Sequence, residues 1–545
     1  MPTARASSAP LWPIVLVMAA AVALRLPNLL ESLWFDEYLT SASMAPHVSL
    51  LLKTIYGDIH PPGYLVFGWC WATWVGSSEL MLRLPALVLG LGTIWLVYRA
   101  AIAWFDGDAG PRIGLVAATF LALSPTHIWY SQEARPYSGL MFLAMAFVMC
   151  HVRLRRGDAG RWAGFGLALL ATALVSTHFF VVAFVSTAIV LALWPGTRRR
   201  RAIWLATGIP VLLVVGYVGA KMYVSEFQSA KYYLRAFDLG EAWQLFFNWF
   251  LSGNVFTPRH HDAWSGWAVA LVVFQVVGVL AFVLGVMRVM RSGRDSGAPG
   301  WHVVAFLSSV PAFLFVLPFL GLDHTYIERS TVLVLPLYAI VLAAGVVSFD
   351  RGFRGSWGAL VLCQVAALIA LHAHQGLWTV YKPNPDWRAA AAHLTQEIEA
   401  GGSGRPIYSN YKSPETLSYY EPRIQPAKRF IENTARYDRL RTSAESVFGA
   451  GSIVVELVSD ILDEYATLQR DAEQATRLRI YLLADHDPRG ETAAPSPDGR
   501  FYVLHYALPG GADPVVVELL ESERLRVVDQ HRFASLTLYE VERTP

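Results

Sequence analysis

Long apolar runs alternate with short polar connections from residue 10 to residue 374. Each run approaches the ~20 residues that a helix needs to cross a bilayer core of about 30 Å. The pattern therefore predicts a polytopic α-helical membrane protein with about eleven transmembrane helices. The expected spans are 10–26, 81–104, 113–130, 137–152, 162–177, 179–195, 202–220, 264–287, 301–320, 330–348 and 357–374.

Composition supports this class. Hydrophobic residues make up 54% of the 545 residues and charged residues 16%, whereas globular chains have roughly 45–50% and about 25%. The first run is followed by Arg25-Leu26-Pro27-Asn28 rather than a small-residue cleavage site, so we expect an anchored helix and not a cleaved signal peptide. The three cysteines are not spaced for a disulfide framework or a zinc site.

Arginines predict the orientation, because basic residues gather in cytoplasmic loops. Every second connection is basic, and we expect these connections and the N-terminus to be cytoplasmic in a plasma (inner) membrane. The basic connections hold Arg112, Arg153 to Arg161, Arg198 to Arg201, Arg288 to Arg294, and Arg351 with Arg354. The alternate connections are then outside, and so is the C-terminal part of the chain.

The outer connections are the longer ones, which is typical of functional loops. Loop 27–80 is aromatic, and its stretch 63–75 suits a helix lying at the membrane interface. Loop 221–263 is the second long outer connection. We therefore expect residues 1–377 to form a transmembrane module in which these two loops carry function.

Residues 378–545 are charged and poor in long apolar runs, and we expect them to form a soluble extracytoplasmic α/β domain. Asp386 is a candidate N-cap for a helix, and 459–479 fits an amphipathic helix. Strand-like runs occupy 453–457, 501–508, 515–519 and 524–541.

The first outer loop opens with the acidic pair Asp36 and Glu37 in an aromatic setting. Carboxylates near hydrocarbon are costly and tend to be paired or functional. Desolvation would raise the pKa of such a carboxylate toward the useful range of a general base. The alternative is an acidic pair that simply faces water.

Asp58 and His60 lie in a turn stiffened by Pro61, Pro62 and two glycines, followed by Tyr64. The turn either holds this acid and histidine above the membrane for chemistry or only leads into a helix. Both readings are open at this point.

Glu133 and Arg135 share a very short outer connection with Tyr137. The planar fork of an arginine suits a phosphate oxygen, although a Glu133–Arg135 ion pair that only shapes the turn is the alternative. Arg83 and Arg329 are further arginines at the outer ends of spans. His260 and His261 invite a metal reading, but adjacent loop histidines are more often solvated, and we expect no metal site.

Five segments together resemble the GT-C superfamily of membrane glycosyltransferases that use polyprenyl-phosphate sugars. The resemblance is greatest to the branch that contains protein O-mannosyltransferases and the lipid A aminoarabinose transferase. The segments are Trp34-Phe35-Asp36-Glu37, His60-Pro61-Pro62-Gly63-Tyr64, Arg83-Leu84-Pro85, Tyr130 to Tyr137, and Pro385 to Ala390. Their order matches over roughly the first 150 residues and again near 385.

The resemblance implies roles for these residues. Asp36 matches the acid proposed as the base for the acceptor nucleophile, and Glu37 is its neighbour. Glu133 and Arg135 match a second polar cluster, which we assign to the donor with Arg83, Tyr137 and Arg329. His60, Asp58 and Tyr64 are assigned to the acceptor side. The order Tyr326-Ile327-Glu328-Arg329 departs from the Arg-Tyr-like pair that the resemblance predicts.

We therefore expect an inverting glycosyltransferase that moves a monosaccharide from a polyprenyl-phosphate donor to a lipid, protein or glycan acceptor on the outer face. The resemblance implies no cofactor and no metal, and nothing points to a nucleic-acid partner. A ligase or polymerase with a pyrophosphate-linked donor is the nearest alternative. A transporter is disfavoured, because no two-fold repeat is evident and the acids lie at the rim.

Overall fold

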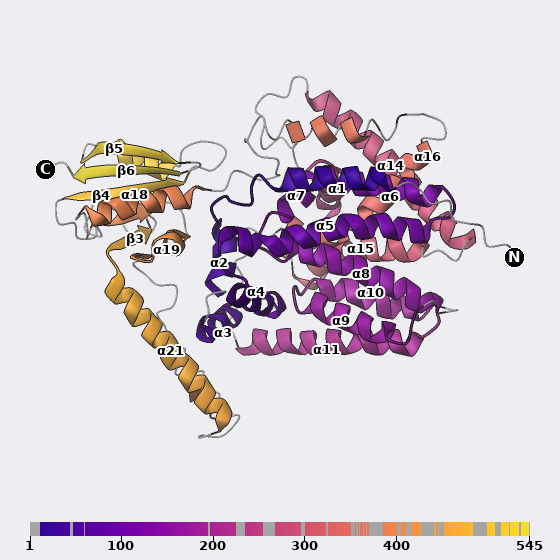
Figure 1. Ribbon diagram of the computed structural model, residues 1–545, viewed down its shortest axis with the longest axis horizontal. Coiled ribbons are helices and arrows are strands. Elements are labelled where there is room, and N and C mark those ends of the chain that lie inside the picture. Colours follow the sequence, from indigo (N-terminus) through magenta and orange to yellow (C-terminus); the bar gives the residue numbers. More distant parts are fainter. Residues whose placement is uncertain are drawn as a thin grey trace. The chain divides into compact units, whose positions relative to one another are not determined.

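The chain forms two compact units in a computed structural model (Figure 1). One unit comprises Met1–Leu29, Gly57–Phe67 and Leu80–Tyr381, and the other comprises Leu30–Tyr56, Gly68–Glu79 and Lys382–Pro545. The structure describes residues 11–43, 47–58, 60–157, 159–194, 197–224, 235–253, 267–295, 300–322, 325–349, 355, 358, 360–362, 364–366, 368–369, 385–400, 405–409, 416–426, 441–442, 445, 452–482, 499–506, 514–522, 524–533 and 536–543.

The first unit is a bundle of apolar helices. Its helices and helical turns are α1 (Trp12–Arg25), α5 (Glu79–Trp104), α6 (Ala109–Leu123), α7 (Pro125–Tyr130), α8 (Tyr137–Arg156), α9 (Ala163–Val175), α10 (Val181–Ala192), α11 (Arg200–Val224), α12 (Leu239–Gln244), η1 (Leu245–Trp249), α13 (Phe250–Ser252), α14 (Trp267–Asp295), α15 (Gly300–Val316), η3 (Leu317–Leu320), η4 (Glu328–Val334) and α16 (Leu335–Phe349). Helix α16 is buried along nearly its whole length and packs on α6 and α14.

Ten of the expected spans match helices of this unit. In the described residues, six helices are long and apolar enough to cross a membrane, and four more apolar helices are shorter. The expected span 357–374 is helical at 360–362, 364–366 and 368–369, and its other residues lie mostly outside the described set. The total of eleven transmembrane helices stays a prediction.

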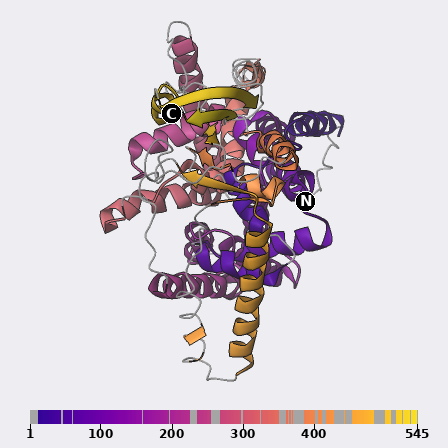
Figure 2. The same ribbon diagram turned by 90° about the vertical axis from the view of Figure 1, so that its left-hand side faces the viewer.

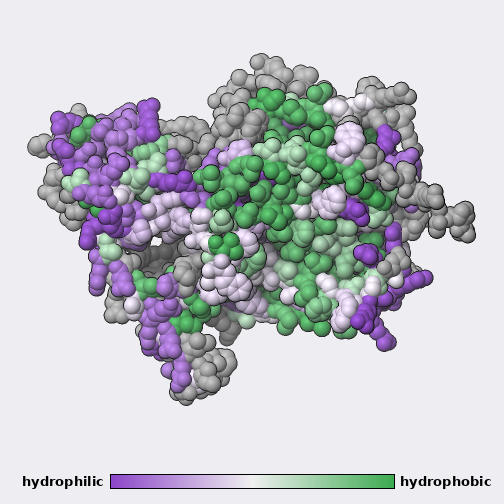
Figure 3. Space-filling model, viewed as in Figure 1, coloured by the Kyte–Doolittle hydropathy of each residue, from purple (hydrophilic) through white to green (hydrophobic). Residues whose placement is uncertain are grey.

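Many exposed apolar side chains lie on the face of this bundle that Figure 3 shows. On α11, for example, Leu205, Leu212 and Leu213 are exposed, although water would penalise them. Such a surface is compatible with lipid rather than with water.

Helices α14 and α16 cross at two glycines. A Cβ atom on Gly345 would overlap the carbonyl oxygen of Ala281, and one on Gly285 would overlap that of Val341. Small residues let helix backbones approach closely, which is the usual means of packing helices inside a membrane.

The second unit contains a mixed six-stranded sheet in the order β2-β3-β1-β4-β6-β5. Neighbours among β1, β2, β3 and β4 are parallel, and β6 pairs antiparallel with β4 and β5. The strands are β1 (Ile407–Ser409), β2 (Ile424–Pro426), β3 (Leu478–Leu482), β4 (Arg500–Tyr506), β5 (Leu525–Phe533) and β6 (Leu536–Arg543).

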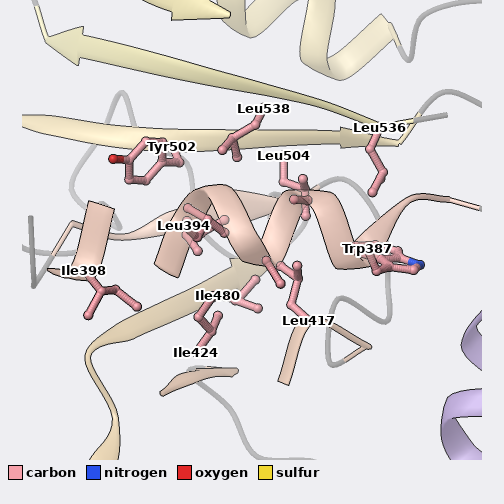
Figure 4. Packing of buried hydrophobic residues seen from close by; sticks show 13 residues of the cluster. Trp387, Leu394, Ile398, Leu417, Ile424, Ile480, Tyr502, Leu504, Leu536 and Leu538 are labelled. Carbon is pink, nitrogen blue, oxygen red and sulfur yellow. The ribbon is translucent and has the colours of Figure 1, made fainter. Parts of the chain in front are cut away.

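Alternation along β4 builds a core on each face of the sheet, because successive strand residues point to opposite faces. Tyr502 and Leu504 pack with α18 (Trp387–Glu399) and α19 (Thr416–Tyr420), as Figure 4 shows. Phe501 and Val503 pack on the other face with Val516 and Leu519 of α22 (Pro514–Leu520).

Three further helices of this unit come from the connection between α1 and α5. They are α2 (Phe35–Ser43), α3 (Val48–Gly57) and α4 (Gly63–Trp74), the last of which begins in the first unit. The expected helix at 63–75 is therefore present as α4. The remaining helix, α21 (Ile453–Ala475), is long and extends away from the sheet (Figure 2).

Two expected strands are wrong. Residues 453–457 begin α21, because the Ser452 hydroxyl accepts the Val455 N–H at 3.3 Å and so caps a helix. Residues 515–519 belong to α22, which starts with Pro514 and buries Val516 and Leu519 at helical spacing while Val515 is exposed. The expected helix 459–479 ends at Ala475, and β3 follows.

Candidate active site

Asp58 and His60 form a hydrogen-bonded pair in the turn between α3 and α4. The Asp58 Oδ1 atom accepts the backbone N–H of His60 at 2.9 Å and lies 2.7 Å from the ring Nδ1 of His60. An aspartate that bonds the backbone two residues ahead is a common turn-forming device. The bond fixes both the turn and the orientation of the imidazole.

The same turn is tied to the connection between α9 and α10. The Gly63 N–H donates to the Ser176 carbonyl at 2.7 Å, and a Cβ on Gly63 would overlap the Ser176 hydroxyl. Only glycine permits this approach. The imidazole of His60 consequently lies beside that of His178, with ring centroids 4.7 Å apart.

His178 is a buried histidine that sequence reasoning did not propose as a site residue. Its ring stacks on Phe179 at 5.1 Å. Burial, together with the charges of His60, Arg329 and Arg135, holds the pKa of His178 well below its usual value. The ring is therefore neutral at pH 7.

Arg135 and Lys221 act on the Asp58–His60 pair. Burial by itself would raise the pKa of Asp58, but the hydrogen bonds and charge of His60 and the charge of Arg135 outweigh burial and hold that pKa well below its usual value. The Lys221 ammonium donates to the backbone carbonyl of Asp58. The charge of Arg329 lowers the pKa of the neighbouring His178.

The first unit thus gathers charged and polar side chains from widely separated segments, and we call this set the rim cluster. It contains Asp58, His60, Arg135, His178, Lys221 and Arg329. Asp58, His60, Arg135 and Arg329 were candidates from the sequence, whereas His178 and Lys221 were not. Each of these two is a single polar residue at the end of an apolar run, which is the only signal the sequence offers.

The turn that carries Glu133 and Arg135 is held by buried hydrogen bonds. Ser131 donates to the His127 carbonyl at 2.6 Å, and Ser138 donates to the Tyr130 carbonyl at 2.7 Å. The ring of Tyr137 lies 4.6 Å from that of Tyr130. Glu133 is buried and Arg135 is half-buried, so the arginine is the more accessible of the two.

Arg25, which was not a candidate from the sequence, contacts the residues on the N-terminal side of this turn. Pro125 has no N–H to donate to the end of α6, and the buried Arg25 guanidinium instead donates to the carbonyls of Leu121 and Ala122, each at 3.1 Å. It also lies 2.7 Å from the Nδ1 atom of His127. Its own carbonyl accepts from Gln132 at 3.0 Å.

Arg83, which the sequence assigns to the donor, is fully buried. Its Nη1 atom donates to the carbonyls of Leu29 at 3.0 Å and Asn28 at 3.4 Å. Arg83 therefore contacts the backbone that follows α1. Tyr64 is half-buried in the first turn of α4.

The connection before α16 is fixed by Arg235. Its backbone forms a bridge with Tyr326, and its guanidinium pairs with Glu328 and with Glu241, the latter at 2.7 Å. Burial would lower the pKa of Arg235, but the two carboxylates outweigh burial and raise it. Glu328 is therefore paired with Arg235. The charge of the next residue, Arg329, helps to lower the pKa of His178 in the rim cluster.

Asp36 and Glu37 lie in the second unit, in the first turn of α2. The Glu37 carboxylate is buried and its Oε2 accepts the Trp34 N–H at 3.3 Å, so Glu37 helps to cap its own helix. Asp36 is half-buried, and its backbone carbonyl accepts from Thr40 at 3.1 Å. The two acids therefore have different surroundings within one helical turn.

Other candidates lie outside the described residues. These are His260 and His261, the histidines considered for a metal site. Within the described part of the chain, no group of three or more histidine, cysteine, aspartate or glutamate side chains is arranged to hold a metal ion.

No protein-family model matches the chain, and no curated protein matches it in sequence. In contrast, the chain shares its fold with a solved structure. It is similar to ArnT from Cupriavidus metallidurans bound to undecaprenyl phosphate, with a TM-score of 0.51, 14% identity and 98% of each chain covered.

Two further structures have lower similarity. The apo state of the same ArnT has a TM-score of 0.49 at 12% identity and covers 97% of each chain. The archaeal oligosaccharyltransferase AglB from Archaeoglobus fulgidus, in complex with an inhibitory peptide and a dolichol-phosphate, has a TM-score of 0.40 at 11% identity, covering 75% of this chain and 63% of its own. The likeness to ArnT bound to undecaprenyl phosphate confirms the fold class expected from the sequence, whereas the number of spans and the side of the membrane on which the C-terminal domain lies stay predictions.

Proposed function

We propose that this chain is an inverting glycosyltransferase that moves a monosaccharide from a polyprenyl-phosphate donor to a lipid, protein or glycan acceptor at the outer face of the membrane. The observation that carries the proposal is the concentration of cations at the rim cluster, in a chain with the fold of ArnT. The ArnT structure holds undecaprenyl phosphate, a lipid phosphate of the class proposed here.

The donor phosphate is proposed to bind Arg135 and Arg329. Glycosyl transfer breaks the bond between the anomeric carbon and the phosphate oxygen, and the electron pair of that bond leaves with the polyprenyl phosphate. Negative charge then develops on the leaving phosphate, and preorganised cations stabilise it. The half-buried Arg135 provides a planar fork of donors for two phosphate oxygens.

The Asp58–His60 pair is proposed to shape the acceptor side of the site. The charge of the Asp58 carboxylate is balanced by the surrounding cations, so it remains ionised and accepts from His60. The imidazole is then held with one nitrogen engaged and the other available to a hydroxyl. Tyr64 belongs to the same proposed side.

Asp36 is proposed as the base. An acceptor hydroxyl or amine attacks the anomeric carbon, forms the new bond and gives its proton to the Asp36 carboxylate. One base and one displacement invert the anomeric centre, because no second carboxylate has to act as a nucleophile. The step requires no metal in this proposal.

The test uses the full chain purified into lipid nanodiscs. Radiolabelled polyprenyl-phosphate monosaccharides are supplied one at a time, with a total membrane extract as the acceptor pool, with and without EDTA. Transfer of one sugar that persists in EDTA supports the proposal. Transfer only from pyrophosphate-linked donors, or from none, contradicts it.

A further inference from the structure

The segment Asp386-Trp387-Arg388 has no role in the function proposed above. Trp387 is fully buried in the core on one face of the sheet, where Figure 4 shows it at one end of the cluster. Asp386 caps α18 by accepting the Ala389 N–H at 3.0 Å. The backbone of Asp386 and Arg388 is consequently fixed to the core of the C-terminal domain.

Side chains from this domain hold the segment Leu30–Leu33, which belongs to the same unit. Arg388 donates to the Leu30 carbonyl at 2.9 Å, and the Tyr420 hydroxyl accepts the Leu33 N–H at 2.7 Å. The Ser32 hydroxyl donates to Asp386 at 3.2 Å and accepts the Arg388 N–H at 3.2 Å. Three of four successive residues are therefore bound at specific polar atoms, and we call Asp386, Arg388 and Tyr420 the latch.

The latch residues also contact one another and Glu79, which belongs to the same unit. The Nε atom of Arg388 donates to Glu79 at 3.2 Å, and the guanidinium lies 5.9 Å from the ring centre of Tyr420. Burial raises the pKa of Tyr420 above its usual value, so the hydroxyl stays neutral and suited to accept the backbone N–H.

The latched segment runs directly into α2. Trp34 follows Leu33 and donates its N–H to Glu37, and Asp36 lies in the same helical turn. We propose that Asp386, Arg388 and Tyr420 are positioning residues that fix the N-terminus of α2, and with it Asp36, from the C-terminal domain. The part of this inference that concerns turnover rests on the proposed function, whereas the anchoring itself does not.

Loss of the latch is expected to change the position of Asp36 more than the folding stability of the chain. The Arg388 side chain is 49% exposed, and exposed ion pairs contribute little to folding. A displaced catalytic group, in contrast, costs up to about a hundredfold in rate for a shift of about 1 Å. A variant can thus remain folded and still lose turnover.

The experiment compares Arg388→Ala and Tyr420→Phe with Arg526→Ala, all in the full chain in nanodiscs. Arg526 is the matched control because it forms an exposed ion pair with Glu542, also in the C-terminal domain. Hydrogen–deuterium exchange is followed over residues 30–38. The turnover number and the donor KM are then measured with whichever donor the parent chain uses.

We expect faster exchange at residues 30–38 in both latch variants and parent-like exchange in Arg526→Ala. We also expect a roughly ten- to hundredfold lower turnover number with an unchanged donor KM, because the base and not the donor site is displaced. Parent-like exchange in both latch variants overturns the inference, and faster exchange with parent-like turnover overturns the positioning role. If the parent uses no donor, the proposed function fails, and the exchange result alone decides the anchoring.

Discussion

The Nδ1 atom of His60 lies 2.7 Å from Oδ1 of Asp58, and the same oxygen accepts the backbone N–H of His60. One carboxylate thus fixes both the main chain and the ring of the histidine. The neutral ring of His178 has its centroid 4.7 Å from that of His60. The charges of Arg135 and Arg329 act on the same histidine.

Asp58→Asn is expected to lower sugar transfer by about tenfold or more, because a hydrogen bond to a charged group contributes roughly 1.5–3 kcal/mol. The lowered pKa of Asp58 means that its carboxylate is ionised above the usual value near 4 and loses its charge only as pH falls well below that value. The parent should therefore keep this contribution throughout pH 5–8. A kcat/KM profile over that range measures both points.

Asp108→Asn is the matched control for this prediction. Asp108 is exposed and makes no side-chain capping bond at the start of α6, so its replacement should leave transfer unchanged. Equal activities of the two variants would remove Asp58 from the proposed acceptor side.

Arg135→Gln is expected to weaken use of the donor by roughly ten- to hundredfold in kcat/KM, because a charged donor to the phosphate is lost. Arg291→Gln, at an exposed arginine near the end of α14, should behave as the parent. Donor titrations at a saturating acceptor concentration distinguish the two. Parent-like kinetics of Arg135→Gln would contradict the assignment of this arginine to the phosphate.

Gly345→Ala is expected to destabilise the helical unit by about 1–3 kcal/mol, because the added methyl overlaps the Ala281 carbonyl where α16 crosses α14. Gly216→Ala on α11 is the control, since a Cβ there meets no atom within 4 Å. That control should be neutral or slightly stabilising. Thermal unfolding in nanodiscs measures both, and equal midpoints would contradict the close crossing.

Glu421→Gln tests the electrostatics of the C-terminal domain. The bidentate hydrogen bonds from Arg423, at 2.7 and 2.9 Å, lower the pKa of Glu421 to about 2. Because the folded pKa lies below the unfolded value, the stabilisation is complete above about pH 5 and is lost as pH falls toward 2. The variant should unfold at a lower temperature than the parent at pH 7, by roughly 2–4 °C for each kcal/mol lost, and the difference should shrink toward pH 2. A difference that does not depend on pH would contradict this account.

The sequence predicts the helices of the bundle because long apolar runs have few alternatives in a bilayer. It fails at 453–457 and 515–519, where β-branched residues favour a strand locally but Ser452 and Pro514 start helices. Short apolar runs do not carry enough periodicity to decide between the two structures.

The site is predictable only in part, for a related reason. Asp58 and His60 stand out because a proline-rich turn displays them, whereas His178 joins them only once the fold brings the connection between α9 and α10 against Gly63. Arg25 is similar, because its partners are backbone carbonyls far along the chain. Because every residue has a backbone carbonyl, the sequence does not show which carbonyls a side chain will contact.

The central claim is glycosyl transfer with Asp36 as the base, and one comparison tests it most directly. The parent chain and Asp36→Asn are reconstituted in nanodiscs, and sugar release from the accepted polyprenyl-phosphate donor is measured, with hydrogen exchange of α2 as a check on folding. We predict a loss of about 10²- to 10⁴-fold in the variant with α2 intact, as expected when a general base is removed. Parent-like transfer by Asp36→Asn would contradict the account.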